Sequence, residues 1–210
     1  MRLAATGEGT GETLVYVHGE EEMEETARLL SGSGVTLVSI QDFDWNRDLS
    51  PWPAPAAFRG GGDFAGEGPS HLTRLLSAID GFEKGRAWQV KRRGIGGYSL
   101  AGLFALYAAC ACDRFDFAVS ASGSLWYDGF LEYMRSHPAR VRAAYLSLGD
   151  KEPRAKNPRL AKVGEATEEA ARILAAQGVN TRFEWNPGNH FVDAPARLSR
   201  GILDAARRGF

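Results

Sequence analysis

The sequence has 210 residues, 44% of them apolar and 24% charged, with a formal net charge of −1. This composition is typical of a globular protein with a sizeable core, and we expect one domain over residues 1–210. No basic stretch is interleaved with aromatic residues, so nucleic acid is excluded as an expected partner. No apolar run approaches the roughly 20 residues that cross a bilayer, and residues 1–7 lack the apolar core of a signal peptide. We therefore expect a cytoplasmic protein without a membrane partner.

Strand and helix patterns alternate along the chain. The first predicted strand, residues 13–17, is rich in β-branched and aromatic side chains. A short helix over about 21–31 separates it from a second strand at 35–40, and such a β-α-β unit predicts parallel strands. The remaining predicted elements continue the alternation: strands at 94–99, 115–121, 143–149 and 181–185, and helices at 71–83, 100–112, 160–177 and 194–207.

Residues 41–69 form a long segment with four prolines, five glycines and five aromatic residues. Loops of this length in compact domains are usually functional. We expect the segment to form a pocket wall, with Trp45 and Trp52 lining the pocket. Ser70 is expected to cap the helix that follows, and His71 to lie on the surface.

The stretch 96–102 joins a predicted buried strand to a predicted buried helix through the pattern G-x-S-x-A. A strand that meets a helix in so tight a turn needs small residues two positions before and after the serine, and Gly97 and Ala101 meet this need. Ser99 would then be exposed at the carboxyl end of the strand. The amide of Leu100, at the helix N-terminus, would be ready to meet an oxyanion.

Three residues with complementary chemistry follow predicted strands: Ser99, then an acid at position 150 or 152, then His190. A serine hydroxyl is a poor nucleophile until a base takes its proton. The base must be held in one tautomer by a carboxylate. Because the carboxyl ends of parallel strands share one edge of a sheet, the three side chains are expected to meet there.

The sequence resembles the α/β-hydrolase superfamily, and within it the esterase branch that includes esterase D-like and enterochelin-esterase-like hydrolases. The matching segments span most of the chain: His18-Gly19, residues 97–104, the Ser-Gly-Ser-Leu-Trp stretch 122–126, residues 148–153 and Gly188-Asn189-His190. The resemblance implies a mostly parallel sheet of about six to seven strands with helices on both faces. Antiparallel strands at the N-terminal edge would be missing or reduced to residues 1–6. No cap domain is inserted, so selection of the substrate would fall to residues 41–69 and the turn at Trp126.

In this superfamily the loop after the early strand donates a second amide to the oxyanion hole. This assigns Gly19 and Glu20 to the hole beside Leu100. The glutamates at positions 20–25 also suit the first turns of a helix, so Glu20 is either a helix-start residue or a pocket residue.

The resemblance implies hydrolysis of carboxylic esters through an acyl-enzyme, with neither a metal nor an organic cofactor. A small-molecule ester of small or medium acyl length is the expected substrate. A peptidase or an acyltransferase that uses the same residues, and a hydrolase-fold protein that binds without turnover, stay open as alternatives, as does the oligomeric state.

The acid has two candidates. Superfamily loops commonly read glycine, two variable residues and then the acid, which favours Glu152 in the segment that begins at Gly149. Asp150 directly follows the strand and is the alternative.

Overall fold

The computed structural model describes residues 1–6, 10–19, 23–58 and 60–209. A sheet of seven strands runs through the described chain in the order β1-β3-β2-β6-β7-β8-β9. All neighbours in it are parallel except β1 and β3, which pair antiparallel. The strands are β1 (Arg2–Thr6), β2 (Thr13–His18), β3 (Val35–Gln41), β6 (Arg92–Tyr98), β7 (Phe117–Ala121), β8 (Ala143–Gly149) and β9 (Asn180–Asn186).

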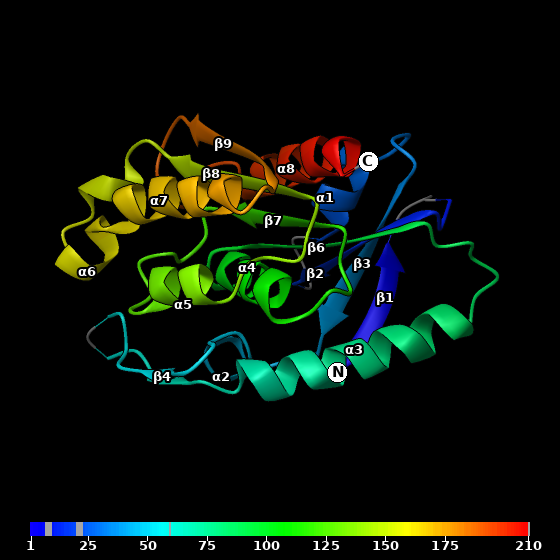
Figure 1. The fold of residues 1–210 in the computed structure, drawn as a ribbon, viewed down its shortest axis with the longest axis horizontal. Coiled ribbons are helices and arrows are strands. Elements are labelled where there is room, and N and C mark those ends of the chain that lie inside the picture. The colour runs from blue at the N-terminus through cyan, green and yellow to red at the C-terminus, as the bar shows by residue number, and fades with distance from the viewer. Residues whose placement is uncertain (7–9, 20–22, 59, 210) are drawn as a thin grey trace.

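Helices cover both faces of this sheet (Figure 1). Helices α1 (Met23–Leu29) and α8 (Ala194–Arg208) pack on one face, where Ala27 and Ile202 belong to one buried cluster. The helices whose apolar residues join the other, larger cluster are α3 (Gly68–Lys84), α4 (Leu100–Ala111), α5 (Phe130–Ser136) and α7 (Val163–Ala176). The short elements are α2 (Trp45–Asp48), α6 (Pro158–Ala161) and a 3-10 helix at Glu152–Arg154.

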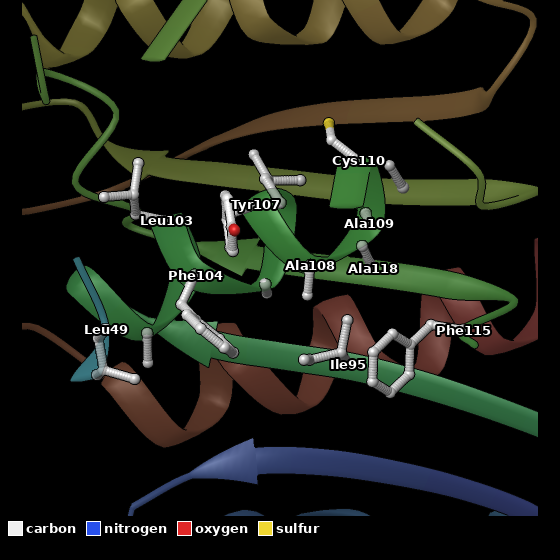
Figure 2. Packing of buried hydrophobic residues seen from close by; sticks show 14 of the residues in the cluster. Leu49, Ile95, Leu103, Phe104, Tyr107, Ala108, Ala109, Cys110, Phe115 and Ala118 are labelled. Atoms are coloured by element: carbon white, nitrogen blue, oxygen red, sulfur yellow. The ribbon is translucent and has the colours of Figure 1, made fainter. Parts of the chain in front are cut away.

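Helix α4 is the centre of the larger cluster. Every residue from Leu100 to Cys110 is buried, as expected for a helix that is apolar all round. Figure 2 shows its side chains beside Ile95 of β6 and Ala118 of β7. The tight packing fixes the N-terminus of α4, and with it Ser99, against the carboxyl end of β6.

The predicted mostly parallel sheet with helices on both faces is confirmed. The expected reduction of the N-terminal edge to residues 1–6 also holds, because β1 is the antiparallel edge strand. No cap domain occurs in the described ranges. Across those ranges, every helix is either too short or too polar to span a bilayer.

Residues 41–69 carry more secondary structure than predicted. They contain α2 and a small two-stranded sheet made by β4 (Pro53–Ala54) and β5 (Phe64–Ala65). Ser50 connects the two ends of this segment, because its Oγ donates to Asn46 O at 2.6 Å and accepts from the Gly66 amide at 2.9 Å.

The predicted start of the next helix was wrong. Helix α3 begins at Gly68 with Pro69 in its first turn, so Ser70 lies inside the helix and is not its cap. Proline suits the first turn because its φ is already helical and because an amide proton at that position would have no acceptor within the helix.

The prediction that His71 lies on the surface was also wrong, because His71 is only 1% exposed. It shares the buried face of α3 with Leu75 and Ile79, four and eight positions later.

Candidate active site

Ser99 occupies the junction between β6 and α4 with φ 57° and ψ −124°. A positive φ is uncommon for a residue with a Cβ, and such strain persists only where surrounding structure imposes it. A Cβ on Gly97 would collide with the backbone of Ala101, so the tight turn requires glycine there. Leu100 is the first residue of α4, and the first amides of a helix have no acceptor within that helix.

His190 follows β9 and meets Glu152, which follows β8. Its Nδ1 donates to Glu152 Oε2 at 2.8 Å. The backbone of His190 is held too, because the Tyr98 hydroxyl donates to His190 O at 2.7 Å. A neutral His190 that donates from Nδ1 has Nε2 free to accept a proton.

The carboxylate of Glu152 is buried and well supplied with donors. Its Oε1 accepts from Ser122 Oγ at 2.7 Å and from the Gly149 amide at 2.8 Å. Burial opposes ionisation of Glu152, but the hydrogen bonds from His190, Gly149 and Ser122 outweigh it and hold the pKa of Glu152 below its ordinary value. Glu152 is therefore anionic at neutral pH.

The two candidate acids face different partners. Asp150 is exposed, and its Oδ1 accepts from the Gly188 amide at 2.8 Å. The structure thus brings Glu152 rather than Asp150 against His190, and uses Asp150 to connect the loop after β8 with the loop after β9.

Ser99 and His190 line the same pocket. Ser99 Oγ lies 3.5 Å from Ser124 Oγ, and the described residues include no hydrogen bond between Ser99 and His190. Catalytic hydrogen bonds are often long or unformed before substrate binds, and a χ1 rotation is enough to redirect a serine hydroxyl.

The pocket has a volume of about 320 Å³. Its apolar lining combines Trp126 with side chains that the sequence analysis did not assign, namely Phe58, Leu160, Val163 and Phe191. The side chains of Phe58 and Phe191 are 63% and 88% exposed. The position of Phe191 directly after His190 could have indicated from the sequence that it lies at the pocket.

Lys151 and Arg154, on the loop that carries Glu152, also line the pocket. No group of three His, Cys, Asp or Glu side chains in the described ranges is arranged to hold a metal ion.

Trp45 and Trp52, which were expected to line the pocket, are not among the residues that line the pocket with Ser99. Trp52 packs against Tyr127, Phe130 and Tyr133, and its Nε1 donates to Asp128 O at 3.0 Å. It therefore attaches residues 41–69 to the turn before α5. Trp45 is 42% exposed and packs against Phe43, with ring centroids 6.0 Å apart.

The amide of Gly19 does not fit the role of an oxyanion donor, because it donates to Ile40 O at 3.2 Å. Gly19 has a φ of 153°, so it supplies the turn at the end of β2. Glu20 lies outside the described residues.

The chain was compared with protein-family models, curated proteins and solved structures. Neither the protein-family models nor the curated protein sequences include a match to the chain. Solved structures do match. A siderophore hydrolase, EstA from Aspergillus nidulans, is 19% identical over 96% of this chain and 85% of its own, with a TM-score of 0.74. An IroE-like serine hydrolase from Shewanella oneidensis is 17% identical over 96% and 73%, with a TM-score of 0.78. The enterobactin esterase FES from Shigella flexneri, solved in the presence of enterobactin, is 18% identical over 99% and 55%, with a TM-score of 0.74.

These neighbours share a fold with this chain over nearly its whole length. The three neighbours are two hydrolases and an esterase. The sheet order, the serine turn between β6 and α4 and this structural likeness together show that the chain has the α/β-hydrolase fold.

Proposed function

We propose that the chain is a serine esterase that cleaves small or medium acyl esters through an acyl-enzyme on Ser99. The observation that carries the proposal is the 2.8 Å hydrogen bond from His190 Nδ1 to the buried Glu152 carboxylate, in the pocket that Ser99 lines. A histidine held in this tautomer by an anion is a general base with its Nε2 free.

In the proposed first step, Ser99 Oγ attacks the ester carbonyl while His190 Nε2 takes its proton. The carbonyl oxygen becomes an anion that the Leu100 amide stabilises, aided by the N-terminal end of the α4 dipole. His190 then gives the proton to the departing alcohol oxygen, which leaves the acyl group on Ser99. Water attacks the acyl-enzyme by the same route and releases the acid.

Glu152 orients His190 and stabilises its charged form in both steps. Its lowered pKa supports this assignment, because a carboxylate must stay ionised to do so. The apolar lining from Phe58, Trp126 and Leu160 supports an apolar acyl group, and a volume of about 320 Å³ is at the small end of ligand pockets.

Hydrolysis of p-nitrophenyl acetate by the wild type, Ser99→Ala, His190→Ala and the double variant tests the proposal. Each single change is expected to lower kcat/KM by at least about 10³-fold, and the double variant to be no worse than either single variant. Multiplying losses would show that the two residues do not act as one unit. Near-normal turnover by folded Ser99→Ala protein would overturn the proposal.

A further inference from the structure

Arg197 is the largest fully buried side chain of the described chain, with 2% exposure. It lies in the first turns of α8, and its amide donates to Asp193 O at 2.9 Å. Arginine is almost never fully buried unless it is paired, because its charge loses hydration. Its partners therefore account for its presence.

Each hydrogen bond of the Arg197 guanidinium reaches the carboxyl end of a different strand. Nη1 lies 3.3 Å from Tyr98 Oη at the end of β6, 3.2 Å from Ser122 Oγ after β7, and 3.4 Å from Glu152 Oε1 after β8. Nη2 donates to Pro187 O at 2.8 Å, in the loop after β9 that leads to His190.

One planar group thus contacts the residue before Ser99, the acid and the histidine loop. Arginine can do this because its five donors are fixed in one plane, whereas a lysine ammonium is a single point charge. The contact to Glu152 Oε1 leaves Oε2 for His190.

We infer that Arg197 is a positioning residue for the proposed reaction: it acts through Glu152 and Pro187 to set the orientation of His190. The inference rests on the proposed esterase function. Arg197 does not line the pocket, so it acts on turnover and not on substrate binding.

The positive charge of Arg197 should also have a measurable effect on the pH dependence of turnover. The Glu152–His190 pair is faced by the Tyr98 hydroxyl from β6 and by Arg197 from α8, while Asp150, Lys151 and Arg154 lie on the acid loop itself. The guanidinium partly offsets the negative charge of Glu152. Removing it would make protonation of His190 easier and would shift the acid limb of the kcat/KM profile to higher pH.

The test uses three variants of the full chain: Arg197→Met, Arg197→Lys and Arg200→Met. Arg200 is the matched control, because it lies on the same helix, contacts Asn186 Oδ1 at 2.8 Å and Glu184 at 3.5 Å on β9, and does not touch Glu152. Thermal melts establish folding, and hydrolysis of p-nitrophenyl acetate is measured between about pH 5 and 9, where histidine titrates.

Arg197→Met is expected to lose about 100-fold in kcat with KM within about twofold. Its acid limb is expected to rise by about half a pH unit. Arg197→Lys keeps the positive charge but loses the planar set of five donors. Its acid limb should therefore match that of the wild type, while its kcat should be about tenfold lower than the wild-type value. Arg200→Met should match the wild type in both readouts.

Wild-type kcat in either folded Arg197 variant would overturn the inference. If Arg197→Met does not fold, Arg197→Lys decides by the same criterion. Absence of turnover in the wild type would instead overturn the proposed function, and the inference with it.

Discussion

Glu152 and Asp150 are two residues apart, yet they make different contacts. Glu152 is buried against His190, Ser122 and the Gly149 amide, while Asp150 accepts from the Gly188 amide on the surface. A residue directly after a strand still follows the pleat of the sheet. A residue two positions into the turn, inside a 3-10 helix, points back towards the neighbouring loop.

Replacing each acid by its amide separates the two roles. In Glu152→Gln, the side-chain amide would donate to His190 Nδ1 and hold the wrong tautomer, so kcat should fall by up to about 10⁴-fold. Asp150→Asn retains an oxygen for the Gly188 amide and should lose less than about tenfold. Both variants are assayed on one ester after thermal melts. A large loss in Asp150→Asn with little change in Glu152→Gln would reverse the assignment.

At the scale of elements, β2, α2 and α3 meet at a buried histidine pair. His18 Nε2 and His71 Nε2 are 2.8 Å apart, and His71 Nδ1 lies 3.7 Å from Asp48 Oδ2 on α2. Asp48 favours a proton on His71 Nδ1, so His71 Nε2 accepts from His18 Nε2–H. Burial lowers the pKa of His71 to about 4, although Asp48 acts in the opposite direction.

This lowered pKa predicts a pH-dependent stability. The folded state disfavours the protonated form, so the unfolded chain binds more protons between pH 6.5 and about 4. The free energy of unfolding should be undiminished above pH 6.5 and fall as the pH drops through that window, by about 3 kcal/mol in total from His71. Asp48, with a pKa of about 2, contributes only below its unfolded value of 3.8.

Urea unfolding at several pH values between about 7 and 5 measures the slope. His71→Gln should reduce the slope without abolishing it, because glutamine does not titrate while burial still holds the pKa of His18 below its ordinary value. His137→Gln is the control, since His137 is exposed. An equal slope in the wild type and His71→Gln would contradict this account.

Elements were more predictable from the sequence than their ends and their contacts. Continuous apolar runs marked α4 and most of the buried strands, because an element buried on all sides carries no polar face. The start of α3 was missed, since Pro69 and Ser70 both favour a helix start and only the backbone geometry distinguishes them. His71 was missed because its burial depends on His18, 53 positions away in sequence.

For the molecule as a whole, the candidate site combines loops that follow four strands. The sequence order of serine, acid and histidine was enough to indicate which loops meet, because parallel strands end at one edge. It was not enough to place Trp45 and Trp52, since side-chain directions in an irregular segment carry no periodicity. The buried Arg197 was missed for a different reason, because its partners come from the end of β6 and from three separate loops.

Phe58 and Phe191 lie far apart in the sequence and line one pocket. If they contact the acyl group, Phe58→Ala and Phe191→Ala should each raise KM about fivefold for a p-nitrophenyl butyrate and less for the acetate, with kcat retained. Trp185→Ala is a matched control, because Trp185 is 41% exposed on β9 and does not line this pocket. Equal effects on both esters would contradict the assignment of these two side chains to acyl selection.

The central claim is that Ser99 is a nucleophile activated by His190. Reaction with a fluorophosphonate, followed by intact mass and peptide mapping, tests it without knowledge of the natural substrate. The account predicts one adduct per chain on Ser99, formed much more slowly in His190→Ala. An unlabelled wild type, or an adduct on the neighbouring Ser124 in place of Ser99, would contradict it.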